Sequence, residues 1–154
     1  MYFITLTVHS WVRWLLIGVL LVVVGRALWA WRRHLPWTSQ DRKMLVWLLG
    51  LADIQLLLGI LLTAFFSPRT SRLFREGSKA LEDAATAYWI MEHAVPMILA
   101  VFLIHVGHVF VRRGQNDLTR HRRALLFFGI ATIIILTSTP WPFTPYGRPL
   151  FRLG

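Results

Sequence analysis

The sequence predicts an all-α integral membrane protein folded as an antiparallel up-down four-helix bundle. Three observations support this prediction: 56% of the 154 residues are hydrophobic, only 16% are charged, and the charged residues gather between long apolar runs. A soluble domain usually has about a quarter of its residues charged. Because lipid cannot satisfy open backbone groups, runs of this kind are expected to cross the membrane as helices.

Four spans are predicted, and together they form a single transmembrane domain of residues 1–154. An α-helix needs roughly 20 residues to cross about 30 Å of hydrocarbon, and each run approaches that length. The fourth run is the shortest unless its helix begins near Leu118. Short connections within the first and last pairs favour antiparallel neighbours. The spans are expected at about 5–29, 44–66, 87–111 and 124–139.

The segments outside the spans are short. The apolar run at the N-terminus lacks a basic region ahead of it and is too long for a signal peptide, so we interpret it as a retained helix. The connection between the second and third spans is expected to form a short amphipathic helix near Leu81 on the outer surface. The tail from Thr139 contains four of the seven prolines and is expected to be extended.

The charge balance predicts both the partner and the topology. The 17 Lys and Arg residues outnumber the 7 Asp and Glu residues, which gives a net charge of +10. These basic residues flank apolar runs, which indicates a lipid bilayer rather than nucleic acid as the partner. Basic residues are most concentrated around the first and third loops, so the positive-inside rule places both loops in the cytoplasm and both termini outside. The basic residues of these two regions are Arg32, Arg33, Arg42, Lys43, Arg112, Arg113, Arg120, Arg122 and Arg123.

Several classes of chemistry are excluded. The chain has no cysteine, so disulfides, thiolate metal sites and cysteine nucleophiles are ruled out. It also has no nucleophile elbow, phosphate-binding loop or HExxH motif, so nothing supports hydrolytic catalysis. The candidates for function are polar residues inside the spans, because ionisable groups at membrane depth are costly and usually mark an interior pathway. They are His9, Arg13, Arg26, Asp53, Gln55, Glu92, His93, His105 and His108.

His9 and His93 are the leading pair. Counted from the outer ends of the first and third spans, their depths agree within roughly 3 Å. Two histidines at one level on different helices suit the two axial positions of a haem b iron, since their nitrogens must approach a flat porphyrin from opposite faces. Gly59 of the second span lies near this level and would leave room for a ring edge. The alternative is that both are interfacial histidines bonded to backbone or headgroups.

The neighbours of this pair suggest supporting roles. Arg13 follows His9 by one helical turn on the same face. It is expected to pair across the bundle with Glu92, to orient a ligand imidazole, or to meet a haem propionate. Simple charge pairing for assembly is equally open. Pro96 cannot donate a hydrogen bond to the carbonyl of Glu92, so the third span is expected to kink there.

His105 and His108 raise the question of a second site near the inner end. They lie about 18 Å and 22 Å along the helix from His93. A second haem or a quinone is conceivable there, favouring His108 by direction and His105 by depth, but the first span offers no ligand at the matching level. The alternative is that both histidines bond backbone carbonyls or face inner headgroups. Asp53 could pair with a basic group, hydrogen-bond a quinone or pass a proton, whereas Gln55 more often makes an interhelical hydrogen bond.

Short motifs along nearly the whole chain resemble a known family. They are the HSWVRW segment beginning at His9, QLLLG at 55–59, Glu92-His93 with Met97, HVG at 105–107, and Trp141-Pro142. Together they resemble a group of short bacterial four-span proteins labelled cytochrome b or cytochrome b-like. This resemblance implies haem b and electron transfer in the bacterial cytoplasmic membrane. It implies ligand roles for His9 and His93 and, less securely, for His105.

Two further hypotheses compete with the hypothesis of a haem b protein. One is a cofactor-free or pigment-contacting accessory subunit of a larger respiratory or photosynthetic membrane complex, with other subunits or a redox partner beside it. The other is a copper-handling protein in which Met91, His93 and Met97 supply soft ligands. Met91 and His93 point about 200° apart on a helix, so one ion cannot easily use both, whereas His93 and Met97 are compatible.

Overall fold

The computed structural model describes residues 1–151 and is helical along most of that length. The long helices are α1 (Tyr2–Arg33), α2 (Ser39–Leu61), α5 (Val95–Arg112) and α6 (Asp117–Ser138). Two π-helical segments adjoin them: η1 (Leu62–Phe66) continues α2, and η3 (Tyr88–Ala94) leads into α5. Between η1 and η3 lie α3 (Arg72–Glu76), the 3₁₀ helix η2 (Gly77–Glu82) and α4 (Ala84–Ala87).

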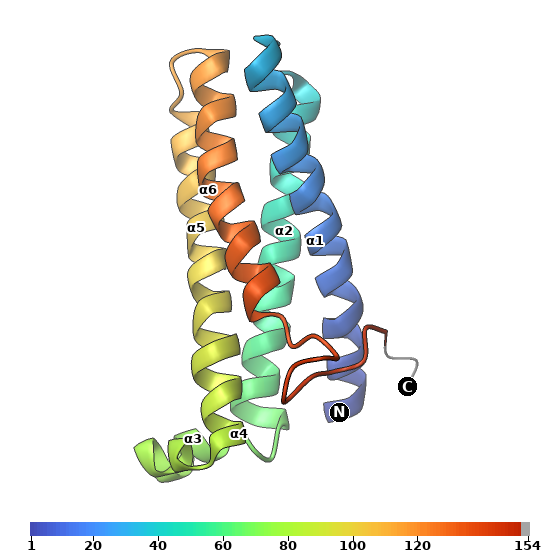
Figure 1. The fold of residues 1–154 in the computed structure, drawn as a ribbon, viewed down its shortest axis with the longest axis vertical. Coiled ribbons are helices and arrows are strands. Elements are labelled where there is room, and N and C mark those ends of the chain that lie inside the picture. Colours follow the sequence, from blue (N-terminus) through green and yellow to red (C-terminus); the bar gives the residue numbers. More distant parts are fainter. Residues whose placement is uncertain (152–154) are drawn as a thin grey trace.

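The long helices form an antiparallel up-down bundle (Figure 1), so the predicted fold class is confirmed. Helix α1 packs against α2 and α6, and α5 packs against α6 and α2. Helices α1 and α5 therefore stand at opposite corners. We call the end with loops 34–38 and 113–116 the basic end. The opposite end, with both termini and residues 67–83, is the tail end.

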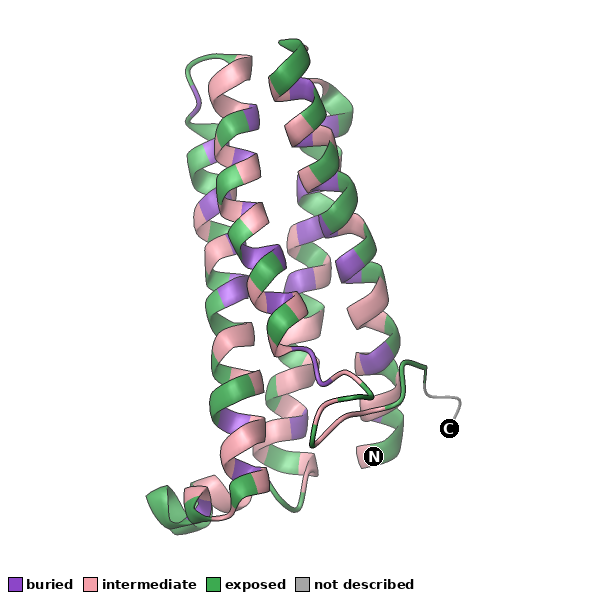
Figure 2. Ribbon diagram, in the orientation of Figure 1, coloured by how far each residue is buried: buried purple, intermediate pink, exposed green. Residues whose placement is uncertain are grey.

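Four helical segments are long and apolar enough to cross a membrane: Tyr2–Arg33, Ser39–Phe66, Ala84–Arg112 and Asp117–Ser138. Each is longer than predicted, because the helices continue past the apolar core to polar capping residues. The fourth begins at Asp117, where the Asn116 side chain accepts a hydrogen bond from the Thr119 amide at 2.8 Å. Exposed residues occur along all four long helices (Figure 2), and many of them are large and apolar, as contact with lipid requires.

The basic end is fixed by one ion pair at a helix start. Arg26 Nε donates to Asp41 Oδ1 at 3.0 Å, joining α1 to α2. The same carboxylate accepts from the Thr38 amide, while the Thr38 hydroxyl accepts from the Asp41 amide, which forms a capping box. Buried Asp41 thus caps the start of α2 and also joins α2 to α1. It also neutralises Arg26, one of the polar residues singled out within the first span.

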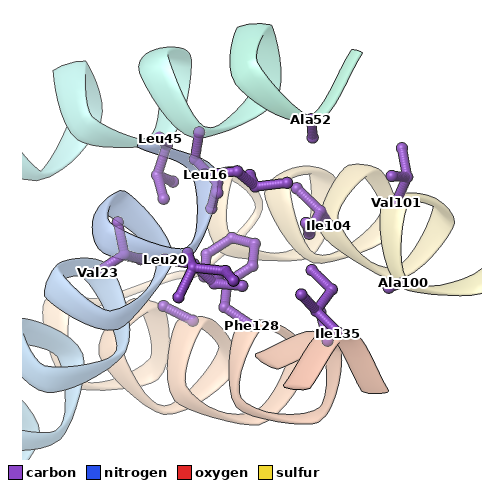
Figure 3. Close-up of a cluster of buried hydrophobic side chains, with 14 of the residues drawn as sticks. Leu16, Leu20, Val23, Leu45, Ala52, Ala100, Val101, Ile104, Phe128 and Ile135 are labelled. Atoms are coloured by element: carbon purple, nitrogen blue, oxygen red, sulfur yellow. The ribbon is translucent and has the colours of Figure 1, made fainter. Parts of the chain in front are cut away.

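Small residues let the helices approach closely in the middle of the bundle. Ala52, Ala100 and Ala131 have no exposed surface, and they lie beside larger apolar side chains of neighbouring helices. Figure 3 shows Phe128 surrounded by side chains from other helices, among them Leu20 and Ile104. Because lipid tails are as apolar as the core, such packing rather than the hydrophobic effect holds membrane helices together.

The third span is irregular where Pro96 enters it. Proline cannot supply the hydrogen bond that the Glu92 carbonyl would need in an α-helix. The chain forms the π-helical turn η3 immediately before, and Pro96 lies in the first turn of α5. A π-helix, a feature that often occurs at functional sites, therefore lies immediately before Pro96, and the kink stays a prediction.

The tail-end segments differ in detail from expectation. Short helices do form between the second and third spans, but Leu81 lies in the 3₁₀ helix η2 rather than in an α-helix. The tail after Thr139 was predicted to be extended, yet it folds into turns, with the Arg148 amide bonded to the Pro140 carbonyl at 3.0 Å. It returns from the end of α6 to the first half of α1 (Figure 1).

We predict that Gly107→Ala destabilises the bundle by about 1–3 kcal/mol, because a Cβ there overpacks a tight interface. It would lie 2.6 Å from Phe127 Cβ and 3.0 Å from Phe128 Cε1. Unfolding in detergent micelles would measure the change. Gly129→Ala is the control, since its Cβ would meet nothing within 4 Å. Equal stability of the two variants would contradict the close α5–α6 contact.

Candidate functional site

The candidate site lies at the tail end, inside the bundle. It combines His9 from α1, Gln55 and Gly59 from α2, His93 from η3, and the backbone of Ser138 at the end of α6. All four long helical segments thus contribute to one cluster. The predicted proximity of His9 and His93 is supported, since charges on His9, Arg13 and His93 lie close enough to interact.

His9 is held by the second span. Its Nε2 lies 3.2 Å from Gln55 Nε2, which gives Gln55 the interhelical hydrogen bond predicted for it. Two buried polar atoms of this pair, His9 Nδ1 and Gln55 Oε1, have no partner among the described residues. A flip of the amide would let His9 Nε2–H donate to Gln55 Oε1, and Nδ1 would then present a free lone pair. Burying unpaired polar atoms is costly, so they favour a missing partner at this point.

His93 is oriented by the last turn of α6. Its Nδ1–H donates to the Ser138 carbonyl at 2.8 Å, because a carbonyl can only accept. Its ring meets the Trp89 ring edge to face, with centroids 5.5 Å apart. This hydrogen bond fixes the tautomer and leaves Nε2 as a lone-pair donor. Histidines that bind metals commonly donate their other nitrogen to a carbonyl in this way.

Gly59 contacts His9 rather than leaving an open slot. A Cβ at Gly59 would lie 3.5 Å from His9 Cε1, which is ordinary van der Waals contact. The expectation that this glycine leaves room for a porphyrin edge is therefore modified. A methyl group at this position would fit against the imidazole, so Gly59 shows only that the His9 ring packs close to the backbone of α2.

Arg13 does not pair with Glu92, contrary to one of the expected pairings. Its guanidinium donates to the Leu150 carbonyl at 3.1 Å and to Ser10 Oγ at 3.3 Å, while Glu92 is exposed. The reason is the returning tail, which brings a carbonyl to α1. Arg13 Nε is buried and without a partner in the described residues, so the guanidinium keeps one donor for a further group.

The tail covers this side of the cluster with aromatic rings. Trp14 Nε1 donates to the Leu150 carbonyl at 2.7 Å, and the Trp14 ring stacks on Phe151 with centroids 5.5 Å apart. The Arg148 guanidinium lies 4.9 Å from the Trp89 ring centroid. The tail therefore links α1 to η3, the two segments that carry His9 and His93. No sequence pattern predicted this contact, because it joins residues more than 130 positions apart.

His105 lies elsewhere, on the face between α5 and α2. Its Nε2 is 2.8 Å from Asp53 Oδ1, and the two side chains are 46% and 56% exposed. Of the three expectations for Asp53, the structure therefore shows the pairing with a basic group. This pair lies in the middle of the membrane span and outside the His9–His93 cluster, so the structure does not place His105 with the leading pair.

His108 lies on the same side as His105 but nearer the basic end. It lines a groove of about 420 Å³ together with Arg42, Arg112 and apolar side chains. Its Nδ1 is buried and unpaired within residues 1–151. Its expected position near headgroups is consistent with this groove, and α1 contributes no residue to the lining.

Copper ligation receives little support from the geometry. Met91 is 54% exposed, whereas Met97 packs against the core and His93 faces Ser138. The described residues contain no group of three or more histidine, aspartate or glutamate side chains that could hold a metal ion.

One buried histidine lay outside the predicted set. His121 precedes the predicted fourth span at 124–139, but α6 begins four residues before it, and the side chain is fully buried against Trp37. Neither ring nitrogen has a partner in the described part of the chain. The sequence signal that could have placed His121 in the helix is a spacing of alternately three and four residues. The buried positions 121, 124, 128, 131 and 135 follow this spacing along one helix face.

We predict that Trp14→Phe loosens the tail while leaving the bundle folded. The substitution removes the hydrogen bond to Leu150 but keeps an aromatic ring against Phe151, and one such bond is worth about 0.5–1.5 kcal/mol. Hydrogen exchange at the amides of Gly147 and Arg148 should accelerate by roughly two- to tenfold. Trp47→Phe is the matched control, since Trp47 is exposed near the other end. Unchanged exchange in Trp14→Phe would refute the tail contact.

The comparisons with known proteins are negative: no family model, no curated protein and no solved structure matches this chain.

Proposed function

We propose that the chain binds one haem b between His9 and His93 and passes electrons within a bacterial cytoplasmic membrane. The observation that carries the proposal is a cluster of buried polar atoms that have no partner within residues 1–151: His9 Nδ1, Gln55 Oε1 and Arg13 Nε. The resemblance to short cytochrome b-like proteins points to the same two histidines. When bound, haem supplies one-electron chemistry, with a potential set by its ligands and burial.

The residues present fit such a group in three ways. His9 and His93 come from helices at opposite corners of the bundle, which suits ligands that approach a flat ring from opposite faces. The bond from His93 Nδ1 to Ser138 leaves Nε2 available as a base. Arg13 offers a cationic donor close to both histidines, and a propionate would be a suitable acceptor.

Gln55 and Trp89 would act as supporting residues. The Gln55 amide hydrogen-bonds to Nε2 of His9 and thereby limits rotation of that imidazole. Trp89 packs against the His93 ring and is itself covered by Arg148. A redox partner would have to approach this tail end, which the positive-inside rule places outside the cell. Quinol is a possible electron donor, because it is carried in the bilayer.

A second candidate function is an accessory subunit of a larger respiratory or photosynthetic membrane complex. The observation that favours it is the Asp53–His105 pair, which is about half exposed in the middle of the span. Ionisable side chains at that depth are rarely left facing lipid. A neighbouring subunit that covers this face of α2 and α5 would remove the cost.

We predict that the protein shows a Soret band, and an α-band after chemical reduction, when it is purified in detergent from cells grown with a haem precursor. Haem content should be about one per chain by the pyridine haemochrome method. His9→Ala and His93→Ala should each lose the spectrum, because each removes an axial ligand. His108→Ala should retain it, because that side chain lines the groove at the basic end.

Two outcomes would contradict the proposal. A stable, monodisperse protein that is colourless and does not bind added hemin would exclude haem. Equal loss of haem in all three variants would show general damage rather than ligation. Stoichiometric co-purification of large membrane subunits with a colourless chain would favour the accessory role instead.

A further inference from the structure

The groove at the basic end has an amphipathic lining that no part of the proposed electron-transfer function uses. It lies between α2 and α5 and has a volume of about 420 Å³. Cationic side chains come from three helices, and apolar side chains lie beside them. The lining residues are Trp37, Arg42, Leu45, Val46, His108, Val111, Arg112 and Arg120.

The cations in this groove are poorly neutralised. Arg120 donates to Asp117 at 3.3 Å and to the Gly114 carbonyl at 3.2 Å. Arg42 and Arg112 form no ion pair within the described residues. His108 also lines the groove, and its Nδ1 is buried and has no partner among the described residues. The groove therefore presents two free positive charges and an unpaired imidazole nitrogen.

The order of residues along the helices matches the order of groups in a phospholipid. Arg42 lies in the first turn of α2 and Arg112 is the last residue of α5, so both lie at headgroup level. Val46 and His108 are each four residues further into the bilayer, about 6 Å deeper. Val46 is 65% exposed and supplies apolar surface for an acyl chain, whereas Leu45 and Val111 line the groove but are almost fully buried. Trp37 also lines the groove, and aromatic rings favour the membrane interface.

We propose that this groove is a binding site for one anionic phospholipid from the leaflet at the basic end. The Arg42 and Arg112 guanidinium groups bind the phosphate, whose charge no cationic headgroup neutralises in an anionic phospholipid, as basic pockets between membrane helices do. The first part of an acyl chain lies along the exposed Val46 side chain. A lipid is the occupant that this chemistry favours, because the groove combines uncompensated positive charge with apolar surface that faces the bilayer.

The experiment is native mass spectrometry of the delipidated protein, titrated with dioleoyl phosphatidylglycerol or dioleoyl phosphatidylcholine. The two lipids share acyl chains and phosphate but differ in net charge. We expect the wild-type protein to retain one phosphatidylglycerol in preference to phosphatidylcholine. The double variant Arg42→Gln/Arg112→Gln should bind phosphatidylglycerol about ten- to thirtyfold more weakly, since each basic residue near a membrane surface contributes about 1 kcal/mol.

The matched control is Arg32→Gln/Arg33→Gln. It removes the same charge from the same end of the bundle, and all four arginines are exposed, but Arg32 and Arg33 lie outside the groove lining. We expect less than about a twofold change for this control, because a screened surface charge acts only at long range. Equal weakening in both double variants would overturn the proposal, since it would show that the lipid is attracted generally to the positive charge of the basic end.

Further measurements distinguish lipid binding from binding of a simple anion and from loss of the fold. Soluble glycerol phosphate at millimolar concentration should not displace phosphatidylglycerol, because it lacks the chain that contacts the apolar lining; displacement would indicate a simple phosphate site. Val46→Ser keeps both arginines and should weaken binding of the lipid, and unchanged binding would refute the acyl-chain contact. Thermal unfolding in detergent should show that each variant is folded. The outcome does not depend on whether haem binds at the tail end.

Discussion

The hydrocarbon interior of a bilayer offers no hydrogen-bond partner, and this constraint organises the protein. Polar side chains in the spans therefore pair with each other or with backbone. Arg26 meets Asp41 between α1 and α2, and the Thr132 hydroxyl donates to the Phe128 carbonyl one turn away at 2.6 Å. The first of these contacts joins two helices and the second satisfies a side chain within one. Few polar groups are available, so each pairing between helices has a large influence on how the spans are rotated.

Buried polar atoms without a partner in the described residues occur at both ends of the bundle, but their surroundings differ. At the tail end, His9 and Arg13 have buried nitrogens without partners in the described residues. At the basic end, the same is true of His108 and His121. The first pair lies beside a second imidazole and supports the haem proposal. His108 lies instead among free arginines and apolar side chains, which suits a lipid.

The tail end is also where the helices depart from regular geometry. Both π-helical segments, η1 and η3, lie there, and η3 carries His93 immediately before Pro96. The tail then passes across α1 and makes hydrogen bonds to Arg13 and Trp14. Local irregularity and a covering segment thus occur around the same cluster. Regular α-helical packing of small residues occurs away from this end, where buried alanines such as Ala52 and Ala131 bring the helices close together.

The sequence by itself determined the class of protein and the number of spans, and it predicted His9 and His93 as the leading pair. These follow from local properties: the length of apolar runs, the position of charges and the helical rise per residue. The tertiary structure decided which polar groups meet. It joined Arg13 to the tail rather than to Glu92, paired Asp53 with His105, and buried His121 in a helix that begins earlier than the apolar run indicates. Such pairings depend on helix rotation and on the path of the returning tail, which are set by packing between distant segments and leave no periodic pattern in the sequence.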